Sequence, residues 1–150
     1  MKAANPYLNF PGNAEEAFEF YRTVFGGEFL SVVRFRDFEG NPMRVPERDL
    51  DRIAHISLPL GPHNTLMGTD VIGSFPEPLQ MGNGFSITIE PESVEEAETL
   101  FDALSAGGRT RMPLQRTEWA EKYGMCTDRF GIQWMLNYTG SVQLPGAGLP

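Results

Sequence analysis

Few side chains in this sequence could carry chemistry, and His55 is the first of them. In the run 53–60 the alternate residues Ala54, Ile56, Leu58 and Leu60 are apolar, so His55 falls on the other side of a strand. If the apolar side packs on helices, His55 faces an open side, where an imidazole could act as a base, a proton donor or a single metal ligand. A histidine that only hydrogen-bonds a neighbouring strand fits the same pattern. His63, in the turn 61–64, is expected to be solvated.

Asp70 ends the next run, 64–70, beside the expected pocket. Its carboxylate could orient His55 or receive a cationic ligand, and a turn-capping role is equally compatible with its position. Asp128 is expected to cap the tight turn before Gly131. Cys126 is the only cysteine, which excludes an intrachain disulfide and a cysteine-based zinc cluster, and we expect it to be a small packed residue.

The composition describes one globular chain of 150 residues with a formal net charge of −8. An acidic surface repels the phosphate backbone, which argues against nucleic acid as a partner. No stretch approaches the length of a membrane span, and residues 1–9 lack the order of a secretory signal, so we expect no membrane partner and a cytoplasmic location.

An internal repeat indicates how these residues are positioned. The segment 13–17 recurs as 93–97, with Glu15, Glu16 and Ala17 shifted by 80 positions. Each segment opens with a predicted capping box, Asn13 with Glu16 and Ser93 with Glu96. The apolar spacing that follows predicts an amphipathic helix in each repeat, ended by the glycine pairs 26–27 and 107–108.

Strand-like runs complete the repeat and predict an α+β fold of two tandem βαβββ modules. The expected strands are 7–10, 28–36, 53–60 and 64–70 in the first module and 85–89, 109–117, 122–127 and 133–139 in the second. We expect a single domain over 1–139, with modules at about 5–71 and 84–139. The connection 37–51 could be a mobile flap or a solvated loop, 71–83 links the modules, and 140–150 is expected to be a flexible tail.

The duplicated unit resembles the vicinal-oxygen-chelate superfamily, which includes glyoxalase I, extradiol dioxygenases and bleomycin-resistance proteins. The segments 6–10, 12–17, 20–27, 54–55, 66–70, 112–115 and 127–135, together with Trp119, are similar to the PhnB-like branch. Members of this branch are often labelled demethylubiquinone methyltransferases. This sequence lacks the glycine-rich strand-to-helix turn that holds a nucleotide-like cofactor, so that label is not transferred. The resemblance implies curved half-sheets around a cavity, and a homodimer.

The resemblance also implies a divalent metal held on the first and last strands of each module. The first strands offer Pro6, Tyr7, Gly84 and Phe85, and the last strands offer Met67 and Met135 in place of the family's glutamates. Thioethers are soft donors, so no cofactor is expected, although a register change of one residue would bring Asp70 or Asn9 nearer and leave room for a weakly bound divalent metal. The implied ligand pocket comprises Tyr7, Met67, Gln115, Trp119 and Met135, with Gln115 and Trp119 suited to hydrogen bonding and stacking.

Three functions follow as alternatives. In the first, an enzyme uses His55, with Asp70 as a candidate partner, to move a proton on a carbonyl or hydroxylated small molecule. In the second, the protein sequesters a cationic or aromatic small molecule without catalysis. In the third, its own side chains fill the cavity and the protein is a scaffold.

Overall fold

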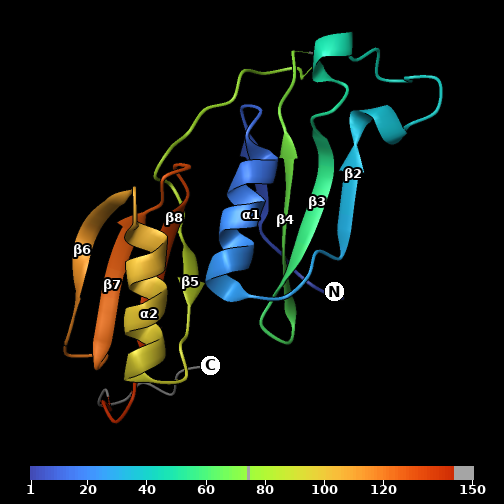
Figure 1. Ribbon diagram of the computed structural model, residues 1–150. Helices are drawn as coiled ribbons and strands as arrows, with labels where there is room; N and C mark the ends of the chain where they lie inside the picture. The colour runs from blue at the N-terminus through green and yellow to red at the C-terminus, as the bar shows by residue number, and fades with distance from the viewer. Residues whose placement is uncertain (74, 144–150) are drawn as a thin grey trace. The chain divides into compact units, whose positions relative to one another are not determined.

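The computed structural model describes residues 1–73 and 75–143, and the chain divides into two compact units (Figure 1). The first unit is Met1–Gln80 and the second begins at Met81, so the division falls within the predicted connection 71–83. In both units a strand and a helix are followed by three strands, which confirms the predicted pair of βαβββ modules.

The first unit contains a four-stranded mixed sheet covered on one face by a helix. Its elements are β1 (Tyr7–Phe10), α1 (Ala14–Phe25), β2 (Ser31–Arg34), β3 (Ile53–Leu60) and β4 (Asn64–Asp70). The strand order is β1-β4-β3-β2, with β1 parallel to β4 and the other neighbours antiparallel.

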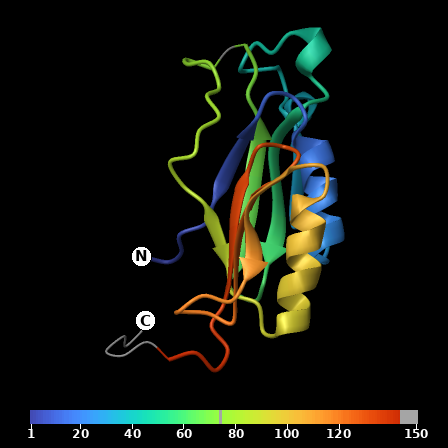
Figure 2. The same cartoon turned by 90° about the vertical axis from the view of Figure 1, so that its left-hand side faces the viewer.

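The second unit repeats this topology. Its elements are β5 (Ile87–Ile89), α2 (Val94–Ser105), β6 (Arg109–Gln115), β7 (Lys122–Thr127) and β8 (Gln133–Tyr138). The order is β5-β8-β7-β6, and β5 runs parallel to β8. Within each unit, Figure 2 shows the helix on one side of its own sheet.

Apolar residues on the helix side of each sheet form the core of that unit. In the first unit Phe18 of α1 lies against Gly68, where an added Cβ atom would stand 2.7 Å from the Phe18 ring. The strand residues on this side are fully or almost fully buried: Leu8, Phe10, Ile56, Leu58 and Leu66. Because side chains alternate along a strand, Tyr7 and His55 lie on the opposite, open face, as predicted for His55.

The two helix N-termini differ from the paired capping boxes that the sequence predicts. In α2 the Ser93 hydroxyl accepts from the Glu96 amide at 3.0 Å, as expected, but the Glu96 carboxylate accepts from the Glu92 amide rather than returning to Ser93. In α1 the predicted Asn13 cap is wrong, because Asn13 makes no side-chain cap hydrogen bond. The Ala14 amide instead donates to the Asp70 carboxylate at 2.9 Å.

The connection 37–51 is built around a small core of its own. Short 3-10 helices, Phe35–Asp37 and Glu47–Asp49, stand at its two ends. Phe35, Val45 and Ile72 are buried together. The Asn41 side chain accepts from the Val45 amide and donates to the Val45 carbonyl, which holds the intervening turn.

The predicted tail, 140–150, is only partly within the described residues. Ser141 donates through its backbone amide and its hydroxyl to the Glu121 carboxylate, and 144–150 lies outside the described residues. In 1–73 and 75–143, no helix has the length and apolar character needed to cross a lipid bilayer.

Candidate functional site

Tyr7 and His55 meet on the open face of the first sheet. The Tyr7 hydroxyl lies 3.1 Å from His55 Nδ1, and the two ring centroids are 5.7 Å apart. Their strands are not neighbours, because β4 runs between β1 and β3. Tyr7 is paired with Met67 in β4, and Met67 is paired with Ser57 in β3, so the phenol reaches across β4 to the imidazole.

The environment of Tyr7 keeps its hydroxyl protonated at neutral pH. Burial raises the pKa of Tyr7 above its ordinary value of 10.0, and a side-chain hydrogen bond with Thr69 opposes this effect without cancelling it. Tyr7 nevertheless remains 45% exposed, so a ligand can approach the pair from the open face. A neutral phenol can donate a hydrogen bond to a proton-free Nδ1 or accept one from Nδ1–H, so it can orient the imidazole in either tautomer.

Asp70 lies on the other side of the sheet from His55. Its two carboxylate oxygens accept from the amides of Ala14 and Ile53, each at 2.9 Å, and only 1% of the residue is exposed. The structure therefore joins the start of α1 to the start of β3 through Asp70. Tyr7, and not Asp70, occupies the position beside the His55 ring.

The structure also places three other residues considered from the sequence: Asp128, Cys126 and His63. The Asp128 carboxylate accepts from the amides of Phe130 and Ile132 and from the Trp134 indole, so it holds the tight turn as expected. Cys126 is fully buried, and burial raises the pKa of its thiol to about 11. His63 lies exposed in the turn between β3 and β4.

Three predicted pocket residues of the second unit gather around Tyr123 of β7. Gln115 is the strand partner of Tyr123, and the Trp119 ring packs edge-on against the Tyr123 ring at 5.2 Å between centroids. The Tyr123 hydroxyl lies 3.4 Å from the Met135 sulfur, and Thr88 donates to the same sulfur at 3.8 Å. Trp119 is 42% exposed, whereas Trp134 is fully buried in the core.

Matching the two sheets by register shows which positions correspond. Tyr7 pairs with Met67 as Thr88 pairs with Met135, and Ser57 pairs with Met67 as Met125 pairs with Met135. Two residues before Ser57 and Met125 stand His55 and Tyr123, respectively. The counterpart of Tyr7 is therefore Thr88, and not Gly84 or Phe85 as the sequence analysis assumed.

Comparison with known proteins agrees with this architecture. Residues 5–136 match the family model described as the Glyoxalase/Bleomycin resistance protein/Dioxygenase superfamily. The chain belongs to this superfamily.

Individual members of the superfamily are similar over most of the chain. Protein YjdN of Escherichia coli K12 is 32% identical over 145 residues, which cover 89% of this chain and 92% of YjdN. The solved structure of PA1353 from Pseudomonas aeruginosa is 39% identical with a TM-score of 0.79, covering 90% of this chain and 96% of that one. A PhnB protein from Bacillus cereus, whose name suggests a 3-demethylubiquinone-9 3-methyltransferase, is 26% identical with a TM-score of 0.72, covering 90% and 98%.

The residues at the positions that the resemblance assigns to a metal do not fit a hard divalent metal ion. Met67 and Met135 supply neutral thioethers, and their register partners Tyr7 and Thr88 supply hydroxyls. In the described parts of the chain no three His, Cys, Asp or Glu side chains lie close enough together to hold a metal.

Sequence reasoning missed Tyr123 and Thr88. Tyr123 alternates with Gly124, which faces α2, since an added Cβ at Gly124 would stand 2.8 Å from Phe101. Tyr123 therefore lies on the open face. Thr88 lies inside the expected strand 85–89, but the candidate positions on that strand were placed at its start, at Gly84 and Phe85, before the observed β5 begins.

Proposed function

We propose that this superfamily member is an enzyme that moves a proton on a carbonyl or hydroxylated small molecule at the open face of its first sheet. The observation that carries the proposal is the 3.1 Å contact between the Tyr7 hydroxyl and His55 Nδ1. It supplies a base and the group that orients it, on a face where Tyr7 is half-exposed.

The roles of the two side chains follow from their hydrogen bond. When Nδ1–H donates to the neutral Tyr7 oxygen, the proton-free nitrogen of His55 is Nε2. Nε2 can then take a proton from a ligand hydroxyl or from the carbon beside a carbonyl. The imidazolium that forms keeps its Nδ1–H bonded to Tyr7, and it returns the proton from Nε2 when the product forms. Tyr7 is thus a positioning residue, and His55 is the proposed catalytic residue.

Exchange of carbon-bound hydrogen with solvent deuterium tests this proposal. Small hydroxyketones such as hydroxyacetone would be incubated with the protein in D2O, and loss of the proton beside the carbonyl would be followed by NMR. We expect the protein to accelerate exchange and His55→Asn to lose at least about 100-fold of that acceleration, because positioned acid–base groups contribute about 10²- to 10⁴-fold.

Two further variants separate chemistry from folding. Tyr7→Phe removes the orienting oxygen and is expected to slow exchange less than His55→Asn. His63→Asn alters an exposed turn histidine and is expected to leave exchange unchanged. Exchange at the wild-type rate in His55→Asn, or no acceleration over buffer by the wild-type protein, would contradict the proposal.

A second candidate function is non-catalytic binding of a flat aromatic molecule, which the Trp119–Tyr123 contact favours. The Trp119 ring is 42% exposed and already rests on Tyr123, so a ligand ring could stack on its free surface. Ethidium is a suitable cationic aromatic probe. Saturable quenching of tryptophan fluorescence that disappears in Trp119→Phe supports this function, since Trp134 is buried. Quenching that persists in Trp119→Phe argues against it.

Homodimer formation and a cytoplasmic location stay predictions of the resemblance and the composition. Light scattering of the purified protein would measure the first.

A further inference from the structure

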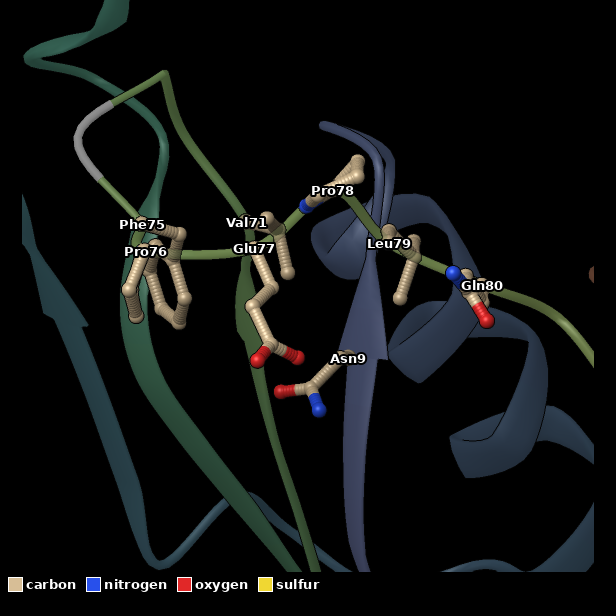
Figure 3. Close-up of a pocket in the computed structure, with 8 residues that line it drawn as sticks. All are labelled: Asn9, Val71, Phe75, Pro76, Glu77, Pro78, Leu79 and Gln80. Atoms are coloured by element: carbon tan, nitrogen blue, oxygen red, sulfur yellow. The ribbon is translucent and has the colours of Figure 1, made fainter.

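A pocket of about 380 Å³ lies beside the end of β1, beneath the segment that follows β4 (Figure 3). Its volume is within the range of small-molecule sites. It is lined by residues from β1 and from that segment: Asn9, Val71, Phe75, Pro76, Glu77, Pro78, Leu79 and Gln80. All of these residues belong to the first unit.

The shape of the pocket is set by how the segment leaves the sheet. The Val71 amide donates to the Phe10 carbonyl at 2.7 Å, which keeps the start of the segment against the end of β1. The Phe75 amide donates to the Ile72 carbonyl at 3.0 Å and closes a turn. Pro76 and Pro78 then fix the backbone φ angle on both sides of Glu77.

The residues that line the pocket carry only negative charge. Glu77 is its only ionisable side chain, and in Figure 3 its carboxylate points toward the Asn9 amide across the pocket. Among the described residues, no Lys, Arg or His forms an ion pair with Glu77. The carbonyl oxygen of Asn9 adds an uncharged acceptor on the facing wall.

Five of the other six lining residues are apolar. Side chains of Val71, Phe75, Pro76, Pro78 and Leu79 surround the two polar groups, and Gln80 stands at one end. A ligand that satisfies this arrangement carries a positive group able to donate hydrogen bonds and a compact hydrocarbon or aromatic body. An anion would meet Glu77 without any compensating positive charge.

We propose that this pocket binds a small organic cation. Its ammonium group contacts Glu77 and Asn9 Oδ1, and its apolar body lies against Phe75, Pro78 and Leu79. The net charge of −8 raises the local concentration of such ligands. The site is separate from the proposed catalytic pair, although Asn9 follows Tyr7 by two residues on the same face of β1.

Binding of benzylammonium, compared with its neutral analogue benzyl alcohol, tests the proposal. Titration followed by amide shifts in a ¹H–¹⁵N spectrum would give both the dissociation constant and the location. We expect saturable shifts at Asn9, Val71 and Leu79 with benzylammonium, and weaker binding of benzyl alcohol. An exposed ion pair corresponds to about 1.4- to 5-fold in affinity, so Glu77→Gln should weaken benzylammonium binding by a factor in that range.

Matched variants make the result decisive. Glu39→Gln removes the same charge from an exposed position of the same unit and should leave the affinity unchanged. Benzyl alcohol should bind wild type and Glu77→Gln equally. Equal benzylammonium affinity in wild type and Glu77→Gln, or the absence of saturable shifts at the pocket amides, would overturn the proposal. His55→Asn should bind benzylammonium like the wild type, so failure of the catalytic proposal and failure of this one are distinguishable.

Discussion

Replacing Asp70 by alanine separates its structural role from the catalytic role that its position in the sequence allowed. The carboxylate is 1% exposed, and each oxygen accepts from one backbone amide, Ala14 at the start of α1 and Ile53 at the start of β3. Alanine leaves both amides without their acceptor inside the core. Asparagine keeps one acceptor and turns its NH2 group toward the other amide donor.

The size of the effect follows from these two hydrogen bonds. A buried donor left without a partner costs about 1–3 kcal/mol, so Asp70→Ala should destabilise the fold by about 2–6 kcal/mol and Asp70→Asn by about 1–3 kcal/mol. The free energy of unfolding of a small protein is about 5–15 kcal/mol in total. The loss expected for Asp70→Ala is a large part of that total, whereas Asp70→Asn should remain folded.

Urea unfolding followed by circular dichroism measures both variants. Asp102→Ala, on the exposed side of α2, serves as the control and should stay within about 0.5 kcal/mol of the wild type. In folded Asp70→Asn, the NMR resonances of the His55 ring should keep their wild-type positions, because Asp70 faces α1. Wild-type stability in Asp70→Ala would refute the assignment of Asp70 as the residue that links the start of α1 to the start of β3. Displaced His55 resonances in Asp70→Asn would refute the separation of the two side chains.

Three further predictions concern single positions. Burial raises the pKa of Tyr7, so the absorbance titration at 295 nm of wild type minus Tyr7→Phe should show a phenol that ionises above pH 10.0. The corresponding stability is present below pH 10.0 and falls as the pH rises through the folded-state pKa; a difference curve centred at or below pH 10.0 would contradict this. With a thiol pKa of about 11, Cys126 is about 0.1% thiolate at pH 8. Ellman's reagent should therefore label the native protein at least about 100-fold more slowly than the urea-unfolded protein. Comparable labelling rates would show that the thiol is accessible. Gly68→Ala places a Cβ 2.7 Å from the Phe18 ring and should cost about 1–3 kcal/mol in urea unfolding, whereas Gly84→Ala, with nothing within 4 Å, should be neutral; equal stabilities would argue against close helix–sheet packing there.

Local sequence signals were sufficient for most of the fold. The alternation of apolar residues, bounded by Gly61 and Pro62 or by the turn at Gly131, predicts the strands 53–60, 64–70 and 122–127 with the bounds that the structure shows. These boundaries depend on side-chain direction and on turn residues that lie a few positions apart. These boundaries can therefore be predicted without any knowledge of the tertiary structure.

The helix cap at Asn13 shows where local reasoning fails. The residues Asn13 to Glu16 have the composition of a capping box, but the Ala14 amide is taken by Asp70, 56 positions along the chain. The motif assigns the Glu16 amide to the Asn13 side chain, and this hydrogen bond does not form. The Asp70 carboxylate binds a different amide of the first turn, that of Ala14. In α2 the Ser93 hydroxyl does accept from the Glu96 amide, as expected.

Each residue of the candidate site could be selected from the sequence, but the contact between them could not be predicted. Tyr7 and His55 were each selected from the sequence, yet their contact depends on the register of three strands in the order β1-β4-β3. No spacing along the chain encodes that register. The same limitation explains why Asp70, which is only one residue beyond Thr69 on the open face, could be taken as a partner of His55: a single step along a strand reverses the side.

The register also shows that a duplicated backbone need not carry duplicated chemistry. In both units a methionine of the last strand pairs with a polar residue of the first strand, Met67 with Tyr7 and Met135 with Thr88. In the first unit the tyrosine and His55 bond to each other across β4, which gives a group that can exchange protons. In the second unit Thr88 and Tyr123 both direct hydroxyls to the Met135 sulfur, which does not titrate. Proton transfer is therefore expected at the first sheet alone, and variants of Thr88 or Tyr123 should affect ligand packing rather than the exchange rate at His55.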